Sequence, residues 1–129
     1  MIRYEEAKDL QRILFCLIER LGLNHIDKDR IKVIRSYNAR TRAYARIYSL
    51  PSAVRYALGL KPIYVIEVIT EKYSMLDEEE RIKVLLHELL HIPPSFSGGL
   101  RPHGKYVNEK IVNSLYRKAE LHLCIESNE

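Results

Sequence analysis

The stretch His87-Glu88-Leu89-Leu90-His91 places two imidazole side chains four residues apart, with a carboxylate directly after the first. Side chains four residues apart on an α-helix lie one above the other, so both rings can bind one metal ion if this stretch is helical. Imidazole nitrogen is a common zinc ligand, and Glu88 would be the general base that takes a proton from a zinc-activated water. The spacing therefore predicts a zinc-dependent hydrolase that attacks peptide carbonyl groups.

The residues around this motif predict a helix that begins near Asp77 and ends near His91. Asp77 followed by Glu80 resembles a capping box, and the two residues between them are also acidic, which suits the positive end of the helix dipole. Pro93 and Pro94 end the helix. Apolar side chains at roughly helical spacing indicate burial on most sides; they are Ile82, Leu85, Leu86, Leu89 and Leu90.

A catalytic zinc ion needs a third protein ligand, for which His103 is the favoured candidate. His103 follows a loop rich in proline and glycine that can return the chain to the end of the motif helix. Glu109 is the alternative, because a glutamate on a later helix completes the metal site in gluzincins. The metzincin spacing would place a histidine at position 97, where this chain has Ser97. His25, His122 and Glu120 are weaker candidates.

The remaining patterns predict one α+β domain over residues 1–129, with a small three-stranded mixed sheet. Helical spacing predicts an N-terminal helix over residues 4–21, a C-terminal helix over residues 105–125 and, less clearly, a short helix over residues 51–60. Branched and aromatic residues predict strands over residues 31–37, 43–50 and 63–70. We expect the third strand or its neighbour to hold an extended substrate backbone beside the motif helix.

The paired motif, the loop of residues 97–104 and the helix after it resemble a family of small metallopeptidases from archaea and phages. This family is similar to the SprT-like zincins, and the resemblance covers residues 62–123. It implies a minimal zincin-like fold, one zinc ion per chain on His87, His91 and His103, and Glu88 as general base. SprT-like relatives range from protein quality control to cleavage of proteins crosslinked to DNA, so the resemblance implies a peptide or protein substrate and allows a DNA-associated role.

A basic segment suggests a second function from another class. Nine basic residues and one acidic residue lie between positions 28 and 61. Arg40, Arg42, Tyr44, Arg46 and Tyr48 follow one another at two-residue spacing, which would place them on one face of a strand. Such a face could bind phosphates and stack bases, as in a nucleic-acid-binding module with a non-catalytic metal site. The alternative is a solvated surface, or arginines paired with the acidic first turn of the motif helix.

Arg101 and Tyr106 lie close to His103 in the sequence. Either could donate a hydrogen bond to the oxyanion of the transition state. Arg101 could instead pin the loop and orient His103 without touching the substrate. Both roles stay open.

Composition limits the remaining possibilities. The 129 residues are 47% hydrophobic and 29% charged, which is typical of an ordinary globular domain. The apolar run of residues 13–18 is too short to span a bilayer, and the acidic residues before it argue against a signal peptide. These features predict a cytoplasmic protein with no membrane contact. Cys16 and Cys124 lie in apolar helical patterns, so we expect buried free thiols rather than a disulfide or metal ligands.

Overall fold

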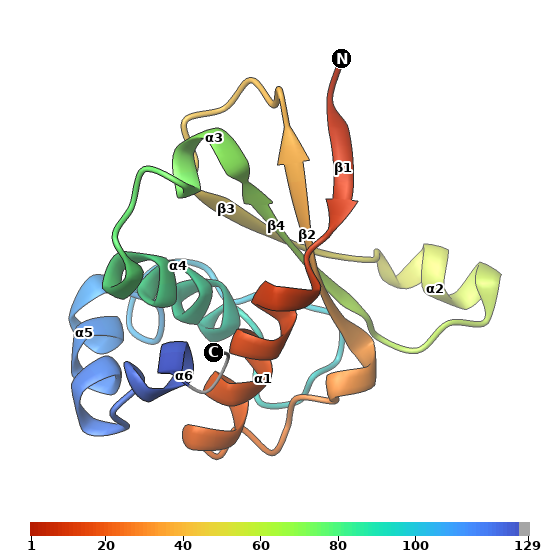
Figure 1. Ribbon diagram of the computed structural model, residues 1–129. Coiled ribbons are helices and arrows are strands. Elements are labelled where there is room, and N and C mark those ends of the chain that lie inside the picture. The colour runs from red at the N-terminus through yellow and green to blue at the C-terminus, as the bar shows by residue number, and fades with distance from the viewer. Residues whose placement is uncertain (127–129) are drawn as a thin grey trace.

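The computed structural model describes residues 1–126 and has an α+β architecture, in which α1 and α4 pack against one face of a four-stranded sheet (Figure 1). Within these residues, no helix combines the length and hydropathy that a membrane span requires. The elements in chain order are β1 (Arg3–Glu6), α1 (Lys8–Arg20), a 3-10 turn (Lys28–Arg30), β2 (Ile31–Tyr37), β3 (Ala45–Ser49), α2 (Ser52–Leu58), β4 (Tyr64–Ile69), α3 (Thr70–Tyr73), α4 (Glu78–Leu90), α5 (Glu109–Lys118) and α6 (Leu123–Glu126).

The sheet has the strand order β1-β2-β4-β3. β2 and β4 run parallel, whereas β1 pairs with β2 and β3 pairs with β4 in the antiparallel sense, so the predicted mixed sheet is confirmed. Ile66 of β4 lies opposite Val33 of β2 and Ile47 of β3, which forms an apolar stripe across the face that the helices cover. β4 is therefore internal, and β3 is an edge strand.

The first strand was not predicted, and the expected helix over residues 4–21 is wrong at its start, because residues 3–6 form β1 and α1 begins at Lys8. All four residues of β1 are exposed, so no apolar alternation marks them as a strand. The backbone of β1 instead pairs with the free edge of β2, from Arg3 opposite Tyr37 to Glu6 opposite Ile34. Pairing with a distant strand thus overrides the local helical pattern.

The core lies between the sheet and the two long helices. Leu14 and Leu17 of α1 are fully buried, as are Leu85 and Leu86 of α4, and all four belong to one cluster with Ile66 of the central strand. Burying a leucine side chain stabilises a fold by about 1.5–3 kcal/mol, so this cluster fixes the position of α4 against the sheet. The motif carried by α4 is held in place by the same contacts.

The C-terminal helix is shorter than the expected span of residues 105–125. The side chain of Asn108 accepts a hydrogen bond from the Ile111 backbone amide at 2.9 Å and starts α5 at Glu109. The helix ends at Lys118, and Glu120 adopts a left-handed conformation with φ of 51° before α6 begins. Glutamate rarely adopts this conformation, and the residue that follows it, Leu121, is completely buried.

The expectation of two free thiols is wrong, because Cys16 of α1 and Cys124 of α6 form a disulfide bond. The two residues are 108 positions apart in the sequence. Helical patterns at the two ends of a chain predict burial for each cysteine separately. They do not indicate that the two helices lie side by side, which is what brings the sulfur atoms together.

Candidate metal centre

The motif is helical, as the sequence predicts. The side chain of Asp77 accepts a hydrogen bond from the Glu80 backbone amide at 2.9 Å, and α4 then continues to Leu90 with His91 as its C-cap. His87 and His91 therefore lie on the same side of the helix, with ring centroids 5.0 Å apart. Residues at this spacing can bind the same ion.

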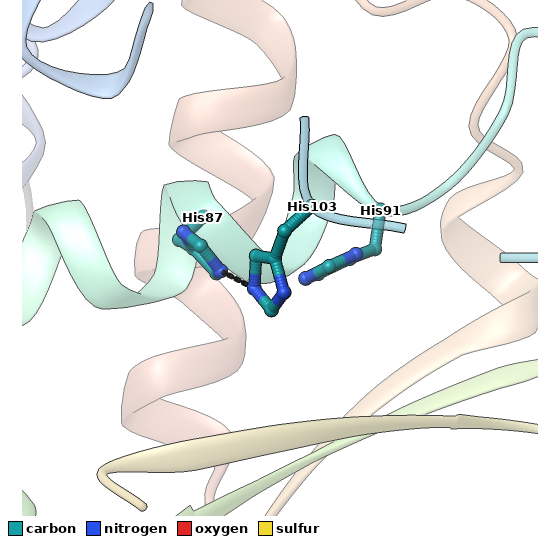
Figure 2. A group of neighbouring side chains, drawn as sticks. All are labelled: His87, His91 and His103. Atoms are coloured by element: carbon teal, nitrogen blue, oxygen red, sulfur yellow. Dashed lines mark hydrogen bonds between the residues drawn. The ribbon is translucent and has the colours of Figure 1, made fainter. Parts of the chain in front are cut away.

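The loop after α4 returns to the helix end and brings a third imidazole to the pair (Figure 2). The His103 ring centroid lies 4.9 Å from that of His87 and 4.7 Å from that of His91. Nε2 of His87 and Nε2 of His103 are 2.8 Å apart, and the ligand atoms of all three side chains lie within 4.8 Å of one another. The three residues form a group that could hold a metal ion, and Glu109 is not part of it.

Hydrogen bonding and burial suit two of the three rings to a role as metal ligands. The carbonyl of Arg101 can only accept a hydrogen bond, so Nδ1 of His91, which is 2.5 Å away, donates to it, and Nε2 is the ring nitrogen that could bind an ion. Burial, together with the neighbouring His91 and His103, lowers the pKa of His87 to about 4, so its ring stays neutral at neutral pH. Ligand nitrogens around a tetrahedral zinc ion are about 3.3 Å apart. This value lies between the 2.8 Å that separates the Nε2 atoms of His87 and His103 and the 4.8 Å within which all the ligand atoms of the group fall.

Glu88 is buried but has no hydrogen-bond partner for its carboxyl group among residues 1–126. Only 7% of the residue is exposed, and this burial raises the pKa of Glu88 to about 7. A carboxyl group with a pKa near neutrality can both accept and release a proton at physiological pH. Unpartnered buried acids of this kind are typical of functional sites.

A groove begins at His87 and Glu88 and runs along α4, between the start of β3 and α5. It is a cavity of about 540 Å³, and Tyr44 and Ala45 form its wall on the sheet side. Glu109, the alternative third ligand, lines this groove from α5 instead of joining the imidazoles. The cluster is thus open to a space large enough for part of a peptide.

Tyr64 of the central strand fastens the loop that carries His103. Its side chain is fully buried, and its hydroxyl donates to the carbonyl of Gly99 and accepts from the amide of Gly98, both at 2.9 Å. Its ring packs edge-on against Phe96 at a centroid distance of 4.9 Å. Sequence reasoning missed Tyr64, because nothing in a buried strand indicates a contact with a loop 35 residues away.

Arg55 of α2 also holds this loop. Its Nη2 donates to the carbonyl of Ser97 at 3.1 Å. Gly98 has a φ of 99°, and a Cβ atom there would come within 2.8 Å of the same Nη2. The left-handed backbone therefore favours glycine at position 98, and a larger residue there would also displace the Arg55 guanidinium from this position.

Arg101 supports the centre through its backbone. Its amide donates to the carbonyl of His91 at 2.7 Å, and its carbonyl accepts from the His91 ring. The Arg101 guanidinium lies over the Tyr106 ring, 4.9 Å from the centroid. This geometry favours loop support, and a direct role of either side chain in the transition state stays a prediction. His25 lies outside the imidazole group; burial, followed by the charge of Arg101, lowers the pKa of His25.

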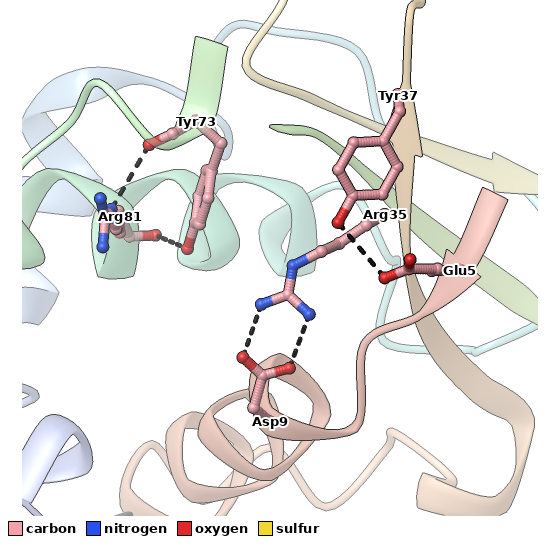
Figure 3. A network of polar contacts seen from close by, with 6 residues as sticks. All are labelled: Glu5, Asp9, Arg35, Tyr37, Tyr73 and Arg81. Carbon is pink, nitrogen blue, oxygen red and sulfur yellow. Dashed lines mark hydrogen bonds and ion pairs between the residues drawn. The ribbon is translucent and has the colours of Figure 1, made fainter. Parts of the chain in front are cut away.

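Part of the basic segment is engaged in the fold. Arg35 of β2 makes two hydrogen bonds to the carboxylate of Asp9 of α1, at 2.8 and 2.5 Å (Figure 3). The hydrogen bond from Arg35 is the largest cause that holds the pKa of Asp9 below its usual value. In the same region, Tyr73 and Arg81 connect α3 to α4, since the Tyr73 hydroxyl donates to the Arg81 carbonyl at 3.0 Å. Arg35 is therefore not available to bind phosphates.

The predicted row of arginines and tyrosines is exposed but does not form one uniform face. Arg40, Arg42, Tyr44, Arg46 and Tyr48 are all exposed, although β3 itself begins only at Ala45. Tyr44 lines the groove, whereas Arg40, Arg46 and Tyr48 border a separate cavity of about 430 Å³. This second cavity also contains the buried Glu67, whose carboxylate accepts a 2.6 Å hydrogen bond from Tyr48. In the described part of the chain, none of these arginines pairs with the acidic start of α4.

We expect Tyr64→Phe to weaken metal binding by about tenfold, because loss of the hydroxyl frees the loop that positions His103. Competition with a chromophoric chelator measures this affinity, and circular dichroism checks that the fold is kept. Tyr56→Phe is the matched control, since Tyr56 is 90% exposed and should bind metal like the wild type. An unchanged affinity of Tyr64→Phe would show that the loop does not need this anchor.

The comparisons with known proteins agree with this geometry. A protein-family model described as "Putative phage metallopeptidase" matches residues 2–120, which include Glu88 and the three clustered imidazoles. No curated protein and no solved structure matches the chain. The match confirms the phage metallopeptidase part of the resemblance, and the similarity to SprT-like zincins stays a prediction. The chain belongs to the family described as putative phage metallopeptidases.

Proposed function

We propose that this protein is a zinc-dependent metallopeptidase that hydrolyses peptide bonds, with Glu88 as general base. The observation that supports the proposal best is the convergence of three imidazoles next to a buried, unpartnered carboxyl group at the head of a groove. Each part has a use in peptide hydrolysis, and the family assignment gives the same class of reaction.

His87, His91 and His103 would hold one zinc ion per chain. Three imidazoles also suit copper, nickel and iron. We propose zinc because three nitrogen ligands and one open position are typical of catalytic zinc sites. When bound, zinc polarises a carbonyl group and lowers the pKa of water toward neutrality. The hydrogen bond from His91 to the Arg101 carbonyl orients that ring and raises its basicity as a ligand.

Glu88 would move the proton during the reaction. Its carboxylate takes a proton from the attacking water and later gives it to the amine that leaves. Its place at the head of the groove, one residue after His87, suits this role. The low exposure of Glu88 strengthens its electrostatic interactions with the reacting groups, because water screens them less.

The substrate backbone would lie along β3. β4, the third predicted strand, is internal and has neighbours on both sides, whereas β3 has one edge without a partner strand among the described residues. Ala45, the first residue of β3, lines the groove beside His87. An extended peptide can add to such an edge through backbone hydrogen bonds, and these bonds do not depend on the identity of the peptide's side chains. Suitable substrates are peptides or locally unfolded proteins.

The cytoplasmic location expected from the sequence remains a proposal. The bond between Cys16 and Cys124 weighs against it, because disulfides are rare in the reducing cytoplasm and common in oxidising compartments.

A second candidate is a DNA-associated function, either as a protease that acts on DNA-bound proteins or as a nucleic-acid-binding module. The supporting observation is that Arg40, Arg42 and Arg46 are exposed and form no ion pair with other residues in the range 1–126. The buried Glu67 beside Arg46 and Tyr48 reduces the positive potential there, so we rank this function second.

Purified protein should contain about one zinc ion per chain, and His87→Ala and His91→Ala should each abolish zinc binding. His103→Ala should lower zinc affinity by at least about tenfold. Metal analysis after dialysis measures the content, with His25→Ala and Glu109→Gln as controls that retain zinc. If His103→Ala binds zinc as tightly as the wild type, the third ligand lies elsewhere.

Glu88→Gln should retain zinc and lose hydrolysis by a factor of about 10² or more, because an amide cannot accept the proton. Cleavage of unfolded casein by the zinc-loaded protein, followed by gel electrophoresis and mass spectrometry, measures the activity. Glu120→Gln changes the charge equally on an exposed residue and should cleave like the wild type. Cleavage by Glu88→Gln at the wild-type rate would exclude Glu88 as the base.

If the DNA-associated function is correct, single- or double-stranded DNA should bind with an affinity that falls steeply with salt, by a logarithmic slope of about −0.9 per phosphate contact in duplex DNA. Changing Arg40, Arg42 and Arg46 together to Gln should reduce the magnitude of that slope by the equivalent of about three phosphate contacts. Changing Lys105, Lys110 and Lys118 to Gln gives the same charge difference outside the segment and serves as control. Weak binding that does not respond to salt would remove this candidate.

A further inference from the structure

We infer that the groove beside His87 and Glu88 is a subsite for a lysine or arginine side chain of the substrate, recognised by the carboxylates of Glu80 and Glu109. This inference rests on the proposed peptidase function and adds to it the chemical class of the substrate side chain. It comes from the shape of the groove, from the burial of Glu88 and from the distribution of charge along the walls.

The groove follows one side of α4 away from the imidazoles. Glu80, Val84 and Glu88 line it at four-residue spacing, so they lie one above the other on the helix surface. At 1.5 Å per residue, Glu80 lies about 12 Å along the helix axis from Glu88. Glu88 is 7% exposed as a residue and lines this space, and its carboxyl group has no hydrogen-bond partner within residues 1–126. Its oxygens are not fully buried, so water or a ligand in the groove can complete their hydrogen bonds.

The walls of the groove combine apolar surface with more acidic than basic side chains. Val84, Val112 and Ala45 supply aliphatic surface, and the half-exposed ring of Tyr44 stands at the sheet side. Glu80 and Glu109 form no ion pair with any residue of the described chain, 1–126. Lys83, the basic residue of the lining, donates instead to Glu79 outside the groove at 2.7 Å. The hydrogen bond to Glu79 is the largest cause that raises the pKa of Lys83, and the charge of Glu80 adds to it. One lysine thus faces three carboxyl groups in the lining, those of Glu80, Glu88 and Glu109, so the groove keeps an excess of acidic groups.

A long basic side chain matches this arrangement. Its methylene groups can pack on Val84 and Val112 while the charged end meets the two carboxylates. An acidic side chain would be repelled, and a bulky apolar one would desolvate Glu80 and Glu109 without pairing them. Both carboxylates also lie in first helical turns, where they stabilise the helix dipole, so the test must separate binding from stability.

The first experiment measures binding without turnover, in zinc-loaded Glu88→Gln protein. The probes are two fluorescein-labelled decapeptides of alanine, glycine and serine, one with a central arginine and one with citrulline, which keeps the shape and removes the charge. The arginine peptide should bind about tenfold more tightly, as expected for charge-assisted hydrogen bonds. Adding Glu80→Gln and Glu109→Gln should reduce the ratio to about one. Adding Glu78→Gln and Glu120→Gln, which change the same net charge outside the groove, should preserve it.

Equal binding of the two peptides, or no detectable binding of either, would overturn the inference. Zinc content is measured in the Glu80→Gln/Glu109→Gln protein as well and should equal that of the parent. A loss of zinc there would make Glu109 a metal ligand rather than part of the subsite, and would overturn the inference too.

The second experiment maps cleavage sites of the zinc-loaded wild type in a proteome-derived peptide library produced by cutting after acidic residues. Lysine and arginine should be enriched at one fixed position next to the cleaved bond, and the double glutamine variant should lose this enrichment. Cleavage without such a preference contradicts the inference but leaves the peptidase function intact. If no peptide is cleaved, the proposed function fails, and the binding ratio of the two decapeptides still decides whether the subsite exists.

Discussion

The candidate metal centre depends on the two hydrogen bonds that His91 and Arg101 exchange. The Arg101 amide donates to the His91 carbonyl at the end of α4, and the His91 ring donates to the Arg101 carbonyl. One pair of groups thus closes the loop, orients the second imidazole and brings His103 within reach of the first. A loop rich in glycine and proline has no internal structure that would fix its ends, and ordering it costs conformational entropy. Tyr64 and Arg55 help to offset that cost through their hydrogen bonds to residues 97–99.

The burial of Glu88 sets a second constraint. A carboxyl group without a hydrogen-bond partner destabilises a folded protein, and the fold around Glu88 offers apolar neighbours such as Leu85 and Leu89 on the same helix. The side chain is tolerated because it opens into the groove, where water or a substrate can complete its hydrogen bonds. The same environment that costs stability raises the pKa of Glu88 to about 7, where proton transfer is efficient. Stability and chemistry are therefore in opposition at this residue, as is common at functional sites.

Two strands of the sheet lie next to the candidate metal centre. β4 is internal and carries Tyr64, which anchors the loop that carries His103, whereas β3 forms the edge strand beside α4. β1 forms the opposite edge strand, and its exposed residues pair with β2 through the backbone. Of the two edge strands, β3 is the one whose first residue, Ala45, lines the groove, which makes its edge the candidate place for an extended peptide.

The amino-acid sequence alone determined the motif helix, with its cap at Asp77, and the strand over residues 31–37, because capping and side-chain periodicity act between residues a few positions apart. It also singled out His87, Glu88 and His91, and it ranked His103 above Glu109 from the character of the loop. Only the tertiary structure decided that His103 joins the pair, that Cys16 meets Cys124, and that residues 3–6 form a strand. These features arise from backbone pairing and packing between segments far apart in the chain, and such contacts leave no mark on the local pattern of residues.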